Sequence, residues 1–133
     1  MRRVISRTLA LFAIFGFAAG ALAAGDFPPQ TSSQSGVTVK VTPRSFAGTE
    51  WQFEVVFDTH SQELKDDLPK AAVLAADGGA PSAPTAWQGD APGGHHRKGV
   101  LRFKATAASP ASVELRLQRP AEAAPRVFRW QLR

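Results

Sequence analysis

The sequence contains three histidines, and each lies where an apolar segment meets a loop. His60 follows the apolar run 51–57, whereas His95 and His96 precede the apolar run 100–103. Imidazole is a common protein ligand for copper, zinc and nickel because its neutral nitrogen is a borderline-soft donor. The residue types therefore indicate a site for a divalent transition metal, with copper and zinc as the candidates.

The spacing of the histidines decides which of them could share one metal ion. If the segments 51–57 and 100–103 are antiparallel neighbours, all three imidazoles lie at one end of the fold. Adjacent histidines in an extended chain point to opposite faces, so His95 and His96 reach one ion only if the loop bends at the glycines before them. A carboxylate would complete the set, from Asp58, Asp66, Asp67 or Asp90. The predicted ligands of Cu²⁺ or Zn²⁺ are His60, His95, His96 and Asp58.

Two other roles for the histidines stay open. His60 follows Asp58-Thr59 and could hold a loop in place by hydrogen bonds, which would make the histidine loop structural. The histidines could also contact a ligand or a partner protein without a metal. The only Met is Met1 and there is no Cys, which disfavours a Cu(I) store or a blue-copper centre in the mature chain.

No arrangement of residues indicates catalysis. The sequence has no G-x-S-x-G, no Cys nucleophile and no H-E-x-x-H. Ser61 is next to His60, but adjacency alone does not orient a nucleophile against its base. Asp66 and Asp67 precede a proline and are typical of a solvated turn. We therefore expect a protein that is not an enzyme.

The N-terminal segment is typical of a secretory signal peptide, predicted over residues 1–23. A basic head precedes an apolar run over residues 9–22, and Ala21 and Ala23 match the A-x-A cleavage pattern. The run is shorter than the ~20 residues that a bilayer span requires. We expect a periplasmic or secreted product without stable membrane insertion, whose core has no disulfides because the sequence has no Cys.

The charge of the chain is unevenly distributed along its length. Cleavage would remove three arginines and lower the formal net charge from +5 to about +2. Residues 26–90 hold nine acidic and four basic side chains, whereas residues 91–133 hold two acidic and nine basic ones. This distribution predicts ion pairs between the two halves of the chain, and it gives no reason to expect nucleic-acid binding.

The apolar pattern predicts strands and almost no helix. Residues 24–36 are polar and are predicted to form a flexible leader. One or two helical turns are expected over 61–68, and the segment 80–94, rich in Pro and Gly, is expected to be irregular with Trp87 covering the core. The first strand should end at Pro43. Period-two alternation and short apolar runs predict strands over residues 37–41, 51–57, 71–76, 101–103, 113–117 and 128–132.

Six short strands in one chain of this length indicate a single antiparallel immunoglobulin-like β-sandwich over residues 37–133. The inward positions of the alternating segments define a predicted interior. The large side chains expected to share this interior are Trp51, Phe53, Phe57, Phe103, Leu115 and Trp130.

Three stretches carry a resemblance to a known family. They are Phe57-Asp58-Thr59-His60-Ser61 with Leu64 and Asp67, then Trp87-Gln88-Gly89, and then the segment GGHHRKGVLRF over residues 93–103. Over residues 37–105 they resemble a family of small exported bacterial and archaeal proteins of unassigned activity. The architecture is also similar to small periplasmic copper-handling β-sandwiches, which bind Cu²⁺ through histidines and a carboxylate. This chain lacks their N-terminal His ligand and their Met-rich segment.

Two hypotheses for the function follow. The first is a periplasmic, non-catalytic β-sandwich that binds a divalent transition metal at His60, His95 and His96. The second is an interaction module that docks an exported or membrane-bound protein and in which the histidine loop is structural.

Overall fold

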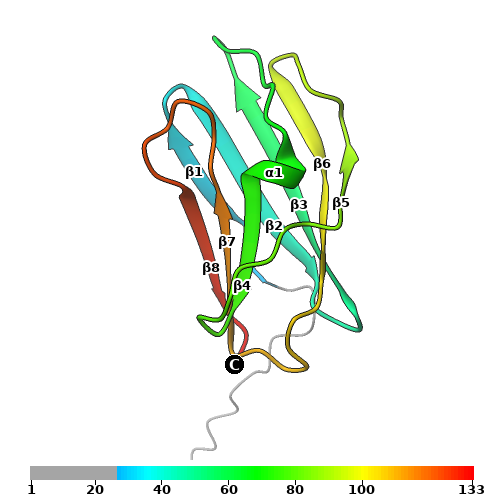
Figure 1. Ribbon diagram of the computed structural model, residues 1–133. Helices are drawn as coiled ribbons and strands as arrows, with labels where there is room; N and C mark the ends of the chain where they lie inside the picture. The colour runs from blue at the N-terminus through cyan, green and yellow to red at the C-terminus, as the bar shows by residue number, and fades with distance from the viewer. Residues whose placement is uncertain (1–26) are drawn as a thin grey trace, which may run out of the picture.

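The computed structural model describes residues 27–133, in which eight strands form two antiparallel sheets that face each other (Figure 1). The larger sheet has the order β1-β2-β3-β6-β5 and consists of β1 (Gln30–Gln34), β2 (Val37–Ser45), β3 (Glu50–Thr59), β5 (Ala86–Gly89) and β6 (His96–Lys104). The smaller sheet has the order β4-β7-β8 and consists of β4 (Ala72–Ala76), β7 (Ser112–Leu117) and β8 (Arg126–Gln131). A short helix, α1 (Leu68–Ala71), leads into β4. The prediction of an all-β sandwich is confirmed.

Alternating side chains from both sheets fill the interior. Along β3 every second residue from Trp51 to Phe57 is buried, and β7 and β8 repeat the same pattern. The loop after β3 adds Leu64, and α1 adds Leu68. The six side chains predicted to share one interior all belong to a single core cluster: Trp51, Phe53, Phe57, Phe103, Leu115 and Trp130.

The N-terminal leader is the clearest departure from the predicted secondary structure. The predicted signal peptide, residues 1–23, and residues 24–26 lie outside the described residues. The prediction of a flexible leader is wrong for residues 30–34, which form β1 and pair with β2 through the turn Ser35-Gly36. Both turn residues have positive φ, 52° and 76°, which suits a two-residue hairpin. The guanidinium of Arg126 donates hydrogen bonds of 2.9 Å to the carbonyls of Ser32 and Gln34, so a residue of the opposite sheet holds this polar strand.

Two prolines act differently from the prediction. Strand β2 does not end at Pro43 but continues to Ser45, with a register shift between these two residues. A proline is tolerated where the ladder is interrupted because its missing N–H is not needed there. The helical turn expected before Pro69 instead begins at Leu68, with Pro69 in its first turn. The first N–H groups of a helix have no intrahelical acceptor, so proline costs nothing at that position.

The segment 80–94 contains strand β5, although it was expected to be irregular throughout. Trp87 pairs with Leu101 of β6, and Gly89 pairs with Gly99. A Cβ built on Gly89 would lie only 2.4 Å from the Cα of Gly99, so the two strands approach closely because both residues are glycine. The prediction that Trp87 packs against the core is confirmed.

Side chains and loops cover both edges of the smaller sheet. At the β8 edge, the carboxamide of Gln30 accepts a hydrogen bond of 3.0 Å from the Arg129 N–H and donates to the Arg129 carbonyl. At the β4 edge, Leu74 and Ser82 exchange two backbone hydrogen bonds of 2.9 and 2.8 Å. Such cover matters because an open edge can pair with another chain. In the described part of the chain, no helix is long and apolar enough to cross a membrane.

Several connections gather at one end of the sandwich, which we call the loop end. It consists of the β1–β2 turn and the β3–α1, β5–β6 and β7–β8 loops, and it lies uppermost in Figure 1, away from the C-terminus. Asp66 of the β3–α1 loop binds Arg119 of the β7–β8 loop with both carboxylate oxygens, at 3.0 and 3.1 Å. Glu122 pairs with Arg119 at 3.2 Å and with Arg126 at 2.8 Å. The pair between Asp66 and Arg119 confirms the prediction that the acidic and basic halves of the chain attract each other.

Candidate binding site at the loop end

The register of β3 and β6 brings one predicted pair of site residues together. Asp58 lies directly opposite His96, and both face outward because their neighbours Phe57 and Arg97 are buried. The distance between Nδ1 of His96 and Oδ1 of Asp58 is 2.5 Å. Both side chains are exposed, at 59% and 58%. The carboxylate therefore orients an imidazole whose Nε2 takes no part in this bond.

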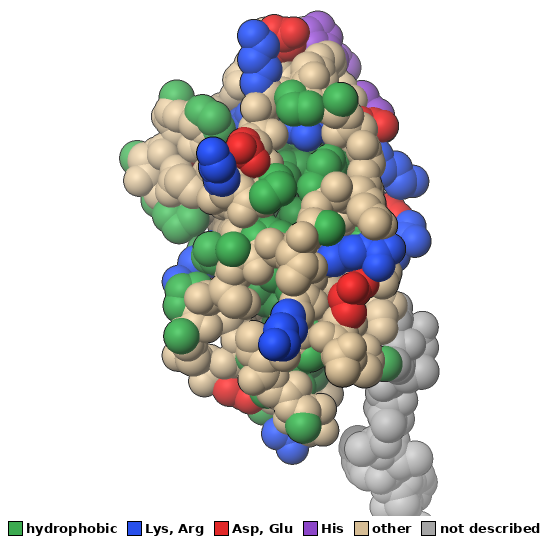
Figure 2. All heavy atoms as spheres, turned by 45° about the vertical axis from the view of Figure 1, so that its right-hand side comes forward, with side chains coloured by type: hydrophobic (Ala, Val, Ile, Leu, Met, Phe, Trp, Pro, Cys, Tyr) green, Lys and Arg blue, Asp and Glu red, His purple; other side chains and the backbone are tan. Residues whose placement is uncertain are grey.

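His60 and His95 have exposed side chains at the same end of the molecule. Figure 2 shows histidine side chains at the top and along the upper right-hand edge of the molecule, near acidic and basic groups. The loop is held by its backbone, since the Thr59 N–H donates to the His95 carbonyl at 3.0 Å and the Leu64 N–H donates to the Gly94 carbonyl at 2.9 Å. The shape of this loop therefore follows from main-chain hydrogen bonds.

The four predicted metal ligands are not gathered around one point. Within residues 27–133, no three side chains of His, Cys, Asp or Glu are placed to hold a metal ion together. Strand pairing brings only two of the four together, because Asp58 lies across from His96 and is the hydrogen-bond partner of its imidazole. Asp58 acts here as the orienting group of a histidine, which differs from the predicted role of a fourth ligand.

The buried guanidinium of Arg97 is the functional candidate that the sequence prediction missed. Arg97 points inward from β6 and is only 2% exposed. Its Nη1 donates to the carbonyls of Asp66 at 2.8 Å and Leu64 at 3.4 Å, and its Nη2 donates to the carbonyl of Asp90 at 3.2 Å. Burial lowers the pKa of Arg97 below its usual value, because removal from water disfavours the charged form. The alternation that placed Leu101 inward also places residue 97 inward, so the signal was present.

Trp87 forms a wall next to this guanidinium. The ring centroid of Trp87 lies 5.6 Å from Cζ of Arg97, a distance typical of a cation–π contact. The indole N–H donates to the Asp90 carbonyl at 3.0 Å. The ring also covers Gly99, where an added Cβ would come within 2.6 Å of it. Gly99 thus makes room for the indole, and the indole reaches Arg97.

A pocket of about 510 Å³ opens beside Arg97 and Trp87. A volume of this size suits a small ligand or a short segment of a larger one. Apolar faces stand next to a buried cation, which favours a ligand that has an apolar body and a polar group. The other residues that line the pocket are Lys65, Asp66, Asp67, Leu68, Pro69 and Pro92.

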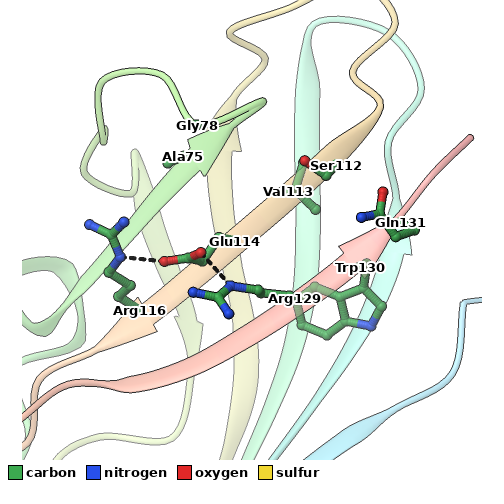
Figure 3. Close-up of a pocket in the computed structure, with 9 residues that line it drawn as sticks. All are labelled: Ala75, Gly78, Ser112, Val113, Glu114, Arg116, Arg129, Trp130 and Gln131. Carbon is green, nitrogen blue, oxygen red and sulfur yellow. Dashed lines mark hydrogen bonds and ion pairs between the residues drawn. The ribbon is translucent and has the colours of Figure 1, made fainter.

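A smaller hollow of about 260 Å³ lies on the β4-β7-β8 sheet (Figure 3). In it the carboxylate of Glu114 accepts hydrogen bonds from Nε of Arg129 at 2.6 Å and from Nε of Arg116 at 2.5 Å. These bonds lower the pKa of Glu114, and the bond from Arg129 contributes most. Because its charged groups satisfy one another, this hollow offers a ligand less than the pocket beside Arg97 does.

Comparison with known proteins gives no indication of the function of this site. No protein-family model, no curated protein and no solved structure matches this chain. The resemblances noted from the sequence therefore stay predictions. The loop end combines exposed imidazoles, one of them held by a carboxylate, with a buried guanidinium that borders a pocket.

Proposed function

We propose that the protein is an exported, non-catalytic β-sandwich that binds a ligand or a partner protein at its loop end. The observation that carries this proposal is the pocket beside Arg97 and Trp87, where apolar faces and a few polar groups converge. Backbone hydrogen bonds connect the two loops that form it, and the ion pair between Asp66 and Arg119 ties one of them to the β7–β8 loop. Loops that are fixed before binding lose less entropy on binding, which favours recognition at this surface.

We also propose that the sandwich is of the immunoglobulin-like type. With β1 left aside, the sheet orders are β2-β3-β6-β5 and β4-β7-β8. They correspond to the A-B-E-D and C-F-G orders of constant-type immunoglobulin domains. In this correspondence the β3–β4 and β7–β8 connections are the B–C and F–G loops, which belong to the binding end of variable domains. The analogy concerns architecture and supports the loop end as a recognition surface without naming what it recognises.

A transition-metal site is the second candidate, and the pair formed by Asp58 and His96 favours it. Histidines that bind metal commonly give their other ring N–H to a carboxylate, which fixes the tautomer and the ring orientation. Asp58 would play this part, and Nε2 of His96 would bind Cu²⁺ or Zn²⁺. The exposed side chains of His60 and His95 would have to rotate toward the ion, because no three ligands within residues 27–133 are already in place.

A metal titration separates the two candidates. Protein purified without an affinity tag and stripped of metal is titrated with Cu²⁺ and with Zn²⁺ in a calorimeter. If the metal site exists, His96→Gln abolishes saturable binding, and Asp58→Asn weakens it by roughly 10–100-fold. Lys98→Gln, at another exposed position of β6, is the matched control. Absence of saturable binding to the unsubstituted protein would exclude the metal site and leave the docking proposal intact.

Docking at the loop end is tested with a photo-crosslinking amino acid in the cells that export the protein. It is placed at Pro92 in the loop end or at Thr106 in the β6–β7 connection at the opposite end, both of which are exposed. We expect specific adducts, detected by mass spectrometry, from position 92 and none from position 106. Equal adduct formation at both positions, or none at position 92, would contradict the proposed surface.

A further inference from the structure

Arg97 is exceptional among the four charged residues that line the pocket. Lys65 pairs with Glu63 at 3.0 Å, and Asp67 pairs with Lys70 at 3.8 Å. Asp66 is neutralised by the bidentate contact with Arg119 described above. Within residues 27–133, the guanidinium of Arg97 has carbonyl oxygens as its hydrogen-bond acceptors and forms no ion pair. The pocket thus borders a buried cation that lacks a directly bonded counterion.

The hydrogen bonds of Arg97 leave part of its donor capacity unused. A guanidinium has five N–H groups in one plane, and it binds a carboxylate best through two parallel hydrogen bonds. Nη1 and Nη2 donate to the carbonyl oxygens described above, while the buried Nε has no acceptor within the described residues. An unsatisfied buried donor is unfavourable, so an acceptor supplied by a ligand would gain more here than at an exposed arginine.

The apolar part of the pocket has a defined shape. One side is the ring of Trp87, which also stacks near the guanidinium, and the rings of Pro69 and Pro92 contribute further apolar surface. The volume of about 510 Å³ falls within the range of pockets that hold small organic ligands. These apolar surfaces suit a flat group of the size of a phenyl ring.

We propose that this pocket recognises a carboxylate attached to a flat apolar group, with the carboxylate facing Arg97 and the apolar group lying against Trp87. The inference rests on the proposed function and names the ligand class for the same surface. Arg97 is covered in the structure, so binding exchanges its 3.2 Å contact with the Asp90 carbonyl for contacts with the ligand. The carboxylate comes from a free organic acid or from the C-terminus of a peptide, since both present the same chemistry.

Paired acids and amides test the proposal on the protein purified from exporting cells and labelled with ¹⁵N. The free-acid probe is 4-phenylbutyrate, and its control is the neutral 4-phenylbutyramide. The peptide probe is a pentapeptide that ends in Phe with a free carboxylate, and its control is the same peptide amidated. We expect saturable shifts of the Trp87 indole N–H and the Arg97 Nε–H signals, with at least one acid binding about tenfold or more tightly than its amide. The acid that binds more tightly identifies the source of the carboxylate.

Variants assign the effect to Arg97. Arg97→Gln should remove the preference for the acid, whereas Lys98→Gln, the outward-facing neighbour, should keep it. If Arg97→Gln does not fold, Trp87→Leu is used. This variant should weaken binding of the acid and of its amide alike, which would show that the apolar group lies against Trp87. Lys65→Gln tests whether the exposed cation at the pocket, and not Arg97, causes the preference for the acid. Loss of the preference in Lys65→Gln alone would overturn the assignment to Arg97.

Two results would refute the ligand class. If the acid and the amide bind equally, the pocket recognises apolar shape and Arg97 only braces the loops. If neither shifts the Trp87 and Arg97 signals, the pocket is not a carboxylate site. The proposed function fails separately, by the absence of adducts at position 92, so the two failures are distinguishable.

Discussion

Arg97 binds three carbonyl groups that belong to two separate loops. Leu64 and Asp66 lie in the β3–α1 loop, and Asp90 follows β5. Arginine suits this task better than lysine because its donors are fixed in a plane and it is more weakly hydrated. Burying a charge costs several kcal/mol. The carbonyl dipoles, the Trp87 ring and the nearby charges of Asp66 and Asp90 offset this cost. The residue thus organises the loop end and gives it a positive centre.

Gly99 is predicted to be intolerant of even one methyl group. An added Cβ would lie 2.6 Å from the Trp87 ring and 2.7 Å from the carbonyl oxygen of Gln88, and neither neighbour can move independently. We expect Gly99→Ala to lower the free energy of unfolding by about 1–3 kcal/mol, the typical cost of overpacking, and to displace Trp87. Urea denaturation and the chemical shift of the Trp87 indole N–H measure both effects. Gly79→Ala, where the nearest atom is 3.1 Å away, should cost less.

Glu122 should make stability depend on pH in the acid range. The pKa of Glu122 is lowered from 4.5 to about 2, mainly by its hydrogen bonds with Arg126. Burial opposes this shift, and the hydrogen bond with Gln34 adds a smaller lowering. A lowered pKa in the folded state adds stability above the unfolded pKa of about 4.5, and this stability is lost as the pH falls toward 2. At 1.36 kcal/mol for each pKa unit, the contribution is on the order of 3 kcal/mol.

The difference between the protein and its Glu122→Gln variant isolates this contribution. Urea denaturation should show the unsubstituted protein more stable at neutral pH, with the difference shrinking as the pH falls from about 4.5 toward 2. Glu63→Gln is the control, because Glu63 pairs only with the exposed Lys65 at 3.0 Å and should change little. A difference between the protein and Glu122→Gln that is independent of pH would contradict the predicted role of the carboxylate.

At the scale of elements, the sequence reveals those strands that bury one face. Strands β3, β7 and β8 follow from alternation alone because their own apolar residues supply the driving force for burial. Strands β1 and β5 were missed because contacts remote in sequence hold them. The guanidinium of Arg126 binds β1, and β5 depends on the close approach of Gly89 to Gly99. Polar or glycine-containing edge strands give little periodic signal of their own.

One part of the candidate site can be predicted from the sequence, and the other part cannot. The contact of Asp58 with His96 follows from antiparallel pairing of the two apolar segments, which the sequence suggests. The pocket beside Arg97 depends on how the β3–α1 and β5–β6 loops pack, and no spacing rule predicts that packing. The sequence predicts that the histidines surround one ion because they lie at the same end of the sandwich. Within the described residues they do not, because a shared end does not fix the direction of a side chain.

Strand β1 is predicted to keep the sandwich monomeric. It covers the outer edge of β2, and its residue Gln30 covers the backbone of Arg129 at the edge of β8. A chain that starts at Val37 loses both covers and leaves Arg126 without the carbonyls of Ser32 and Gln34. We expect this variant to melt at a lower temperature and to form dimers or larger species, because open edges pair with each other.

Size-exclusion chromatography with light scattering measures the effect of removing β1. The matched control is Gln30→Ala, which leaves the β1–β2 pairing in place and uncovers only the β8 edge. It should remain largely monomeric, since β1 itself still lies in the sheet. A chain starting at Val37 that stays monomeric with an unchanged melting temperature would show that β1 is dispensable.

In the folded molecule, ion pairs join the acidic first half of the sequence to its basic second half. Acidic residues of the first half pair with basic residues of the second half, as in the contacts of Glu50 with Arg102 at 2.6 Å and Asp66 with Arg119 at 3.0 Å. The basic half is therefore not a free patch for a polyanion. Arg97 differs from these paired residues, because it is buried and bonded to carbonyl oxygens. Its position at the loop end places a buried positive charge beside the pocket.

Export is the prediction that concerns the whole molecule. The basic head, the apolar run over residues 9–22 and the A-x-A pattern at Ala21 and Ala23 predict a mature protein that begins near Ala24 or Gly25. The first described strand starts at Gln30, after both predicted cleavage points. N-terminal sequencing of protein recovered outside the cytoplasm should return one of these two starts.

Two variants test the export signal. Leu11→Arg interrupts the apolar run and should retain the unprocessed chain inside the cell. Lys40→Gln, an exposed change in β2, is the control and should not affect export. Recovery of exported protein that still begins with Met1 would contradict cleavage and favour an uncleaved anchor.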